Sequence, residues 1–344
     1  MRLCVVSSAH GYGHATRDVV LGEALTRRGH EVTQLAAAPA SVLGAAHRVL
    51  PWVVDVGLVQ PDSLAEDVDA TATALAERCN DDAIDALAAE LRAYDGVVVD
   101  IAPAAMEAAR RAGVPCVAVG NFDWAWVYAH YPALLPWSAR FAAWQAPHPA
   151  VQLVPGPPLT GFSIVAAGGL LARARPAVRI VGADEVAILV GFGGFGLPGL
   201  AEHLPTLPGV RWLFAPPMCA PDRADVRQVD DVPFSSILAG ADVVLTKPGY
   251  GMYGETVRAG VRVVWLDRGR FPEAPWLEAA MCARGDVKVD GAPTAASLRA
   301  AVHASLARPR APALPADDRV AIAARVEAAL GGASPSRGRN VVRL

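Results

Sequence analysis

Short apolar runs alternate with longer stretches of helix-forming residues along most of this chain. In the first half, the apolar runs predict strands at Leu3–Ser7, Val32–Ala37, Val53–Val56, Val97–Asp100 and Cys116–Val119. The stretches between them are rich in Ala, Leu, Glu and Arg and predict helices at Asp18–Arg28, Ser63–Tyr94 and Ala104–Ala112. Because the runs show little polar alternation, we expect a parallel sheet that helices cover on both faces.

The second half repeats this pattern. Its apolar runs predict strands at Ala187–Val190, Val210–Phe214, Val243–Thr246 and Val263–Leu266. Helices are expected near Phe234–Ala239, Met252–Ala259 and Pro275–Arg284. The chain therefore reads as α/β, with two Rossmann-like parallel-sheet domains.

A Pro/Gly-rich segment, VPGPPLTG at Val154–Gly161, divides the two series. We expect an N-terminal domain over residues 1–155, a linker over 156–178 and a C-terminal domain over 179–330. The C-terminal domain would end, after the Pro-rich stretch Arg308–Pro315, in a helix at Asp317–Leu330, followed by a flexible tail over 331–344. Two such domains place a ligand in the cleft between them, beyond the carboxyl ends of the strands.

Composition and charge narrow the partners. The chain has 344 residues, of which 53% are hydrophobic, and a formal net charge of −3. This charge, without any basic run, argues against nucleic acid and against anionic membrane surfaces. No apolar stretch reaches the roughly 18 residues that span a bilayer, and the first residues show no signal-peptide pattern.

The cysteines point to a reducing compartment. They are five in number, form no CxxC pair and are scattered at Cys4, Cys79, Cys116, Cys219 and Cys282. Such a set is typical of reduced thiols in a cytoplasmic protein. We therefore expect a cytoplasmic protein without an integral membrane segment, and its oligomeric state stays open.

The first loop with chemical potential is SSAHGYGHATR, which follows the first strand. It differs from the dinucleotide fingerprint GxGxxG because position 16 is Thr, and no acidic residue ends the second strand. This argues against an NAD-dependent enzyme. His14, at the start of the helix, is either a general base that projects into the cleft or a turn histidine bonded to backbone. Asp100, at the end of its strand, either caps a helix or orients His14.

Two loops of the second domain suit an anionic ligand. In VGFGGFGLPG, Gly193 and Gly194 let backbone amides approach an anion closely, although a plain glycine-rich hairpin fits as well. In KPGYGMYGE, a helix begins near Gly251, so its free N–H groups and dipole favour a phosphate. Lys247 adds a positive charge, and Glu255 is either a ribose ligand or a solvated helical residue. No metal-ligand cluster lies near these loops, so we expect neither a metal nor another cofactor.

At these loops the sequence resembles the inverting GT-B glycosyltransferases, a family that includes plant and macrolide sugar transferases. Gly13 and His14 match the Gly-His of the family's first loop, and Asp100 matches the Asp partner of its catalytic His. The stretch from Lys247 through Gly249 to Glu255 matches the donor motif HxGxxxxxE, in which the Glu binds the nucleotide ribose and the His binds the diphosphate. The matching position here is Lys247 instead of His, and Gly254 replaces a helix-start Ser of many relatives.

A narrower resemblance is to the glycosyltransferase-like N-terminal region of L-arabinokinase and its stand-alone bacterial relatives. It rests on HGYGHATR, DVGLVQPDSL, NFDWAWVY, GFGG and KPGYGMYGE followed by RFPEAPWL, which are spread over nearly the whole chain. The kinase half of arabinokinase is missing, which argues against sugar kinase activity. Ala125 stands where arabinokinase-like sequences carry an acid.

The resemblance implies two domains that face each other across a cleft and a metal-independent, inverting transfer. A sugar would move from a nucleoside diphosphate sugar, expected to be a UDP sugar, to a small-molecule acceptor. The abundance of Ala, Arg, Val and Pro suggests a bacterium with GC-rich DNA, and hence bacterial natural-product biosynthesis as the setting. His14 would be the base and Asp100 its partner. The expected donor-binding residues are Gly193, Gly194, Val232, Lys247, Gly249, Gly251, Met252, Glu255 and Glu273. The expected acceptor-binding residues are His10, Gln60, Asp123 and Trp124, although core packing also explains the aromatic group around Trp124.

Two other functions stay open at this point. The first is a GT-B-fold epimerase that acts on the nucleotide sugar itself, for which Asp123 and Glu273 offer few cleft carboxylates. The second is a non-catalytic nucleotide-sugar-binding protein, against which the pair of His14 and Asp100 argues, because binding alone needs no base.

Overall fold

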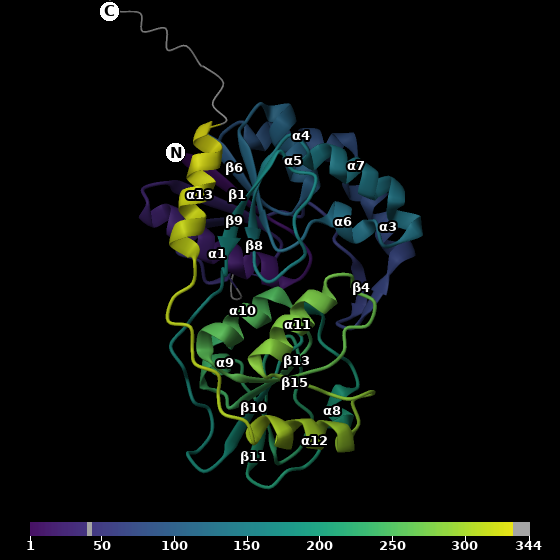
Figure 1. The fold of residues 1–344 in the computed structure, drawn as a ribbon, viewed down its shortest axis with the longest axis vertical. Coiled ribbons are helices and arrows are strands. Elements are labelled where there is room, and N and C mark those ends of the chain that lie inside the picture. Colours follow the sequence, from purple (N-terminus) through teal and green to yellow (C-terminus); the bar gives the residue numbers. More distant parts are fainter. Residues whose placement is uncertain (40–42, 333–344) are drawn as a thin grey trace, which may run out of the picture.

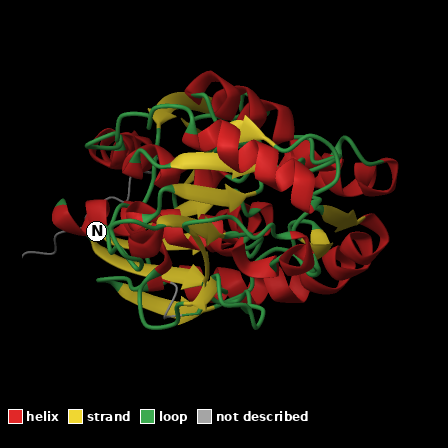
Figure 2. Ribbon diagram, turned by 90° about the horizontal axis from the view of Figure 1, so that it is seen from below, coloured by secondary structure: helices red, strands yellow, loops and turns green. Residues whose placement is uncertain are grey.

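The computed structural model describes residues 1–39 and 43–332. Two parallel sheets, each flanked by helices, lie one above the other in Figure 1. Figure 2, turned by 90°, shows helices on both sides of the strands. The predicted fold class of two Rossmann-like parallel-sheet domains is confirmed.

The first sheet has seven strands in the order β3-β2-β1-β6-β7-β8-β9, and all neighbours are parallel. Its strands are β1 (Arg2–Ser7), β2 (Glu31–Ala36), β3 (Arg48–Pro51), β6 (Gly96–Asp100), β7 (Cys116–Gly120), β8 (Pro149–Leu153) and β9 (Ile164–Gly169). The helices of this domain are α1 (Tyr12–Arg27), α3 (Val68–Arg78), α4 (Asp81–Leu91), α5 (Pro103–Ala112), α6 (Trp124–Tyr128) and α7 (Leu135–Gln145). A short antiparallel hairpin joins β4 (Val59–Asp62) to β5 (Ala65–Asp67).

The second sheet has six parallel strands in the order β12-β11-β10-β13-β14-β15. They are β10 (Val186–Val190), β11 (Val210–Phe214), β12 (Val226–Gln228), β13 (Val243–Thr246), β14 (Arg262–Trp265) and β15 (Val287–Lys288). Around them lie the 3₁₀ turn η2 (Gly193–Phe195) and the helices α8 (Leu200–His203), α9 (Phe234–Gly240), α10 (Tyr250–Ala259), α11 (Ala274–Arg284) and α12 (Ala295–Leu306). The last helix is α13 (Arg319–Gly332).

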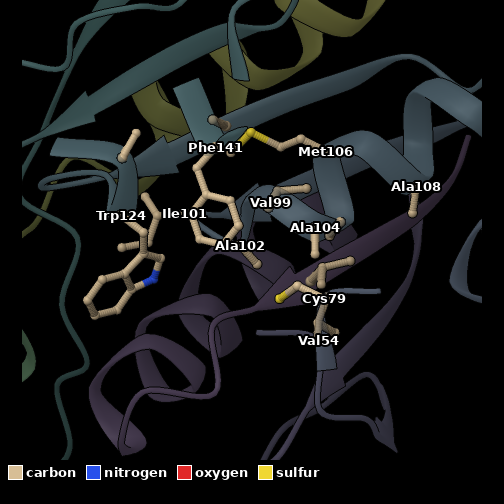
Figure 3. Close-up of a cluster of buried hydrophobic side chains, with 14 of the residues drawn as sticks. Val54, Cys79, Val99, Ile101, Ala102, Ala104, Met106, Ala108, Trp124 and Phe141 are labelled. Carbon is tan, nitrogen blue, oxygen red and sulfur yellow. The ribbon is translucent and has the colours of Figure 1, made fainter. Parts of the chain in front are cut away.

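Successive side chains of a strand enter different cores, as the two-residue period of β-structure requires. In β1, Cys4 and Val6 join the cluster under α4, α5 and α7, part of which Figure 3 shows. Leu3 and Val5 face the opposite side and pack with residues of α1 and α13. Burial on both faces explains why the strands read as continuous apolar runs instead of alternating ones.

The structure differs from the predicted elements at two places in the first domain. The strand expected at Val53–Val56 is wrong, because the third strand is β3 and this segment pairs with no strand. Val54 and Val56 are nevertheless buried in the core, which produced the apolar signal. The single helix expected at Ser63–Tyr94 is instead the turn and second strand of the β4–β5 hairpin, followed by α3 and α4. Asn80 separates these helices and caps α4 by accepting a hydrogen bond from the N–H of Ala83 at 2.9 Å.

Two segments that were predicted to lie outside the first domain, β9 and α13, belong to it in the structure. Strand β9, inside the expected linker 156–178, belongs to the first sheet. Helix α13, expected to close the C-terminal domain, runs along the first domain in Figure 1 and buries Ile322, Val326 and Leu330 against it. Glu327 accepts hydrogen bonds from Arg28 and lies 2.6 Å from a ring nitrogen of His30. Helix α13 thus covers apolar positions of β1 and α1. A flexible tail was predicted over 331–344, and residues 333–344 of it lie outside the described residues.

Gly120 offers a test of the packing behind the sheet's carboxyl edge. A Cβ at this position would lie 2.2 Å from Cγ2 of Ile101 and 3.0 Å from the carbonyl oxygen of Phe122. We expect Gly120→Ala to lower the free energy of unfolding by about 1–3 kcal/mol, because neither neighbour can move freely. Urea denaturation measures this loss. Gly331→Ala is the control, since its Cβ would meet nothing within 4 Å, and equal stability of the two variants would contradict the prediction.

Candidate active site

The carboxyl edges of the two sheets meet, and the first turns of α1 and α10 touch. A Cβ on Gly251 would lie 3.0 Å from the Cα of Gly13, and one on Gly194 would lie 3.3 Å from the ring of Tyr12. The hydroxyl of Ser63 donates a hydrogen bond to the carbonyl of Phe192 at 2.6 Å, again across the two domains. The loops that carry the predicted chemistry therefore face one another, and we call this region the interdomain site.

Aromatic rings connect the two halves of the interdomain site. The ring of Phe122, after β7, lies 6.0 Å from that of His14 and 5.5 Å from that of Tyr250, which begins α10. Phe271, in the loop after β14, is buried in the core cluster of the first domain. The ring of Phe122 therefore lies between His14 of the first domain and Tyr250 of the second.

His14 lies in the first turn of α1, with 6% of its surface exposed, beside the carboxyl end of β6. Its Nδ1 is 3.0 Å from Oδ1 of Asp100. Arg17, one helical turn further along α1, donates from Nε to Oδ2 of Asp100 at 2.6 Å and from Nη2 to Oδ1. The structure therefore brings the two predicted catalytic residues together and adds an arginine to the pair.

Asp100 is held in its charged form. Burial alone would raise the pKa of this carboxyl group, but the charge of Arg17 and the hydrogen bonds from Arg17 and His14 lower it below its usual value. The next residue, Ile101, has a φ of 45°, which is rare for a β-branched residue and is stored strain at the end of the strand. The strained turn and the ion pair together fix the direction of the carboxylate.

His10 is the second histidine of the loop. Its Nδ1 accepts a hydrogen bond from the N–H of Leu58 at 3.3 Å, and its ring lies 5.0 Å from that of Trp124. Burial, and then the charge of Arg268, lowers the pKa of His10 well below its usual value, so the ring is neutral. Asp55 fixes the preceding backbone by accepting hydrogen bonds from Ser8 Oγ and from the N–H of Ala9, both at 2.6 Å.

On the second domain, α10 begins at Tyr250 with Gly249 as its N-cap, and no side chain caps its N–H groups. Lys247 precedes this helix, and burial, followed by the charge of Arg268, lowers the pKa of its ammonium group. Arg268, which is 5% exposed, donates from Nη1 to Oε1 of Glu273 at 2.6 Å. Two basic side chains and a helix N-terminus therefore share this corner of the interdomain site.

Glu255 lies one turn into α10 and lines a pocket with Ser235, Arg173 and Arg175. Its Oε2 is buried and has no hydrogen-bond partner among the described residues. Burial raises the pKa of this carboxyl group, which a hydrogen bond from Ser235 and the charges of the two arginines oppose. Arg173 and Arg175 come from the segment that connects the domains, so this segment and the helices α9 and α10 of the second domain line the pocket together.

The other predicted donor residues surround the same loops. Gly193 begins η2 with a φ of 69°, in the left-handed region that suits glycine. Val232 precedes α9, and its side chain packs, together with that of Met252, against one core cluster of the second domain. The side chain of Val232 is thus partly buried against this core, and its role toward a ligand stays a prediction.

Three predicted acceptor residues have structural contacts in this fold. Asp123 caps α6 by accepting a hydrogen bond from the N–H of Trp126 at 2.8 Å. Trp124 is 1% exposed and belongs to the core cluster of Figure 3. Gln60 donates to the carbonyl of Asp62 within the β4–β5 hairpin, at 3.3 Å. Their acceptor role stays a prediction, and these contacts place them behind the surface of the interdomain site.

Sequence reasoning missed two residues of the site, Arg17 and Arg268. Arg17 stands three positions after His14, a spacing that puts both side chains on one face of a helix. That signal was available in the sequence. Arg268 follows a strand, as Asp100 does, but its partner Glu273 becomes visible only when the loop is folded.

Within the described ranges, no helix is both long and apolar enough to span a membrane. The same residues contain no group of three or more His, Cys, Asp or Glu side chains that could hold a metal ion.

No protein-family model matches the chain. Among curated proteins it is similar to L-arabinokinase of Arabidopsis thaliana, with 28% identity over 301 residues. The match covers 78% of this chain and 28% of the plant protein, so the chain spans little more than a quarter of that relative's length.

Solved structures are similar to nearly the whole chain. The glycosyltransferase of kitacinnamycin matches with a TM-score of 0.63 and 19% identity, covering 96% of this chain and 94% of that one. The calicheamicin glycosyltransferase matches with a TM-score of 0.63 and 21% identity, covering 97% of this chain and 100% of that one. The predicted fold is confirmed: the chain has the GT-B fold of glycosyltransferases.

Proposed function

We propose that this protein is an inverting glycosyltransferase that uses a nucleoside diphosphate sugar, a UDP sugar in the first instance, and a small-molecule acceptor. The observation that carries the proposal is the opposition, in one interdomain site, of a buried His–Asp pair and the N-terminus of α10. The α1 turn that carries His14 touches the first turn of α10 at Gly13 and Gly251. A base and an anion-binding corner are thus held face to face by a direct contact between domains.

The donor side neutralises a departing diphosphate without help from a metal in this proposal. The free N–H groups at the start of α10, at Gly251 and Met252, offer hydrogen bonds and the positive end of a helix dipole. Arg268 adds positive charge, and Lys247, whose pKa is lowered by burial and by Arg268, would become charged beside a bound diphosphate. The backbone of Gly193 and Gly194 approaches from the loop after β10. Such preorganised donors stabilise charge that develops in a transition state.

The nucleoside and the sugar are assigned to separate contacts. The buried Oε2 of Glu255, which lacks a partner among the described residues, suits a ribose hydroxyl as donor. The backbone near Val232 pairs with the base. Glu273 is assigned to the sugar hydroxyls, and its ion pair with Arg268 fixes its position.

His14 acts as the base. Donation from its Nδ1 to Asp100 leaves the lone pair of Nε2 for the acceptor. Nε2 takes the proton of an acceptor hydroxyl or amine while the acceptor atom attacks the anomeric carbon. The bond between that carbon and the diphosphate oxygen breaks, and the oxygen keeps the electron pair. Attack from the side opposite the leaving group inverts the configuration.

The names of the structural neighbours support antibiotic or other natural-product biosynthesis as the setting, and we propose a cytoplasmic location. The similarity to L-arabinokinase supports the sugar-nucleotide reading, although its match is confined to 28% of that protein.

Thermal shift against UDP, GDP and dTDP and their sugar conjugates tests the proposed function. A ligand at about 100 times its dissociation constant adds roughly 2.7 kcal/mol of stability, which raises the melting temperature measurably. We expect one nucleotide series to respond and inorganic diphosphate, the control for simple anion binding, to respond less. No response to any nucleotide would contradict a donor site. Binding without transfer to any acceptor would favour a nucleotide-sugar-binding protein, and change of the sugar itself would favour an epimerase.

A further inference from the structure

Arg17 uses three of its nitrogens in hydrogen bonds within the interdomain site, yet the proposed reaction does not require it. It is 4% exposed and lies in α1, one turn after His14. Its Nε and Nη2 form a two-pronged bond to the two oxygens of Asp100. Its Nη1 donates to Oδ1 of Asn121 at 2.5 Å, and Asn121 in turn donates to the carbonyl of Pro155 at 2.7 Å. The guanidinium group is therefore fixed on both sides.

The same group also lies beside the base. Arg17 Nη2 is 2.9 Å from His14 Nδ1, and His14 Nδ1 is 3.0 Å from Asp100 Oδ1. Because the guanidinium group only donates, Nδ1 either accepts from Arg17 or, when it carries the ring proton, donates to Asp100. The guanidinium group is always protonated, so a protonated His14 would place two cations next to each other.

We propose that Arg17 is a positioning residue: its two-pronged bond locks the carboxylate of Asp100 in the orientation that faces Nδ1 of His14 and can accept the proton of that nitrogen. The proposal rests on the proposed function for its catalytic meaning, but not for its geometry. It explains why a buried arginine stands beside a residue that must take up a proton.

Other charged and titratable groups surround His14 and Arg17. His10, in the same loop, is neutral, and its ring centroid lies 6.4 Å from that of His14. Asp55, before the β4–β5 hairpin, and Asp18, on α1, are buried carboxyl groups that interact electrostatically with the pair of His14 and Asp100. Tyr250 approaches Arg17 from α10. Burial raises the pKa of Asp55 and of Asp18, which hydrogen bonds to Asp55 and the charge of Arg17 near Asp18 oppose.

The test uses the full-length protein and needs no substrate. Nitrogen NMR of the histidine rings reports which ring nitrogen carries the proton and the pH midpoint at which each ring titrates. The His14 signals are assigned by their loss in His14→Gln. For the wild-type protein we expect the form with the proton on Nδ1. In Arg17→Met, Asp100 loses its partner, so we expect the midpoint of His14 to rise by about one pH unit, a tenfold change in protonation.

Matched variants separate position from charge. Arg27→Met, on the exposed side of the same helix, should leave the His14 signals unchanged. Arg17→Lys keeps a charge but loses the two-pronged bond, so the midpoint should stay within a few tenths of a unit while the ring signals broaden. If Arg17→Met does not fold, Arg17→Lys and Asn121→Ala, which frees one side of the guanidinium group, serve in its place. An unchanged ring environment in every foldable Arg17 or Asn121 variant would overturn the proposal.

Kinetics connects the result to the reaction. The acid limb of kcat/KM should move to higher pH in Arg17→Met, with about a tenfold loss near the low-pH end and a smaller loss at high pH. A uniform loss at all pH values would indicate a structural role alone and would overturn the proposal. If the NMR change is seen and no sugar transfer is found, the proposed function fails while the role of Arg17 stands. If sugar transfer is found and the pH midpoint of His14 is unchanged in Arg17→Met, the proposed function stands and the role of Arg17 is wrong.

Discussion

His14→Ala is expected to lower kcat for sugar transfer by about 10²–10⁴-fold, the range that a general base contributes. The side chain is the group whose free ring nitrogen can take the acceptor proton, since its other nitrogen faces Asp100 at 3.0 Å. Donor affinity should change little, because the proposed donor contacts come from the second domain. Initial rates at saturating donor give the change in kcat, and a separate measurement of the donor's dissociation constant gives the change in donor affinity.

Two further variants sharpen this first prediction. His203→Ala, an exposed histidine on α8, is the control and should keep the wild-type rate. Asp100→Asn should also lower kcat, but it leaves Arg17 buried without its counter-charge, so its melting temperature must be compared first. Turnover near the wild-type level in folded His14→Ala would show that another group, or no group, removes the proton.

Glu255→Ala carries the second largest expected effect, a rise of about 10–100-fold in the dissociation constant of the donor. This corresponds to the loss of a hydrogen bond to a charged group, about 1.5–3 kcal/mol. The carboxylate has a buried oxygen without a partner among the described residues, in a pocket that Ser235 also lines. Calorimetric titration with UDP measures the change.

A double comparison assigns the effect to the ribose. UDP and 2′-deoxy-UDP should differ in affinity for the wild-type protein and should bind Glu255→Ala about equally, because the missing hydroxyl and the missing carboxylate are partners. Glu202→Ala, an exposed glutamate of the same domain, is the matched control. If the variant still distinguishes the two nucleotides, Glu255 binds something other than the ribose.

Much of the fold follows from local pattern. Four of the five strands expected in the first domain, and all four expected in the second, coincide with observed strands to within a residue or two at each end. The failure at Val53–Val56 has a clear cause: its valines are buried in the core, but its backbone pairs with no strand, and apolar residues alone do not report hydrogen bonding between strands. The break at Asn80 was missed because a capping residue inside a helix-rich stretch carries little weight in composition.

The candidate site was reached only in part from the sequence. Motif positions named His14, Asp100, Lys247 and Glu255, and the structure places the first two in direct contact. Arg268 was not found, because its pairing with Glu273 depends on the course of the loop after β14. The acceptor role of Asp123 and Trp124 stays a prediction. Residue type alone did not show that Asp123 caps a helix and that Trp124 is 1% exposed.

The sequence by itself determined the two parallel sheets, the glycine-rich turns after their strands and the helix that begins beside Lys247, because each of these depends on residues close together in the chain. Only the tertiary structure decided that β9 and α13 complete the first domain, and that Arg17 meets Asp100 across 83 positions. A buried charge must find a partner, but which partner it finds depends on the loops that the topology brings together.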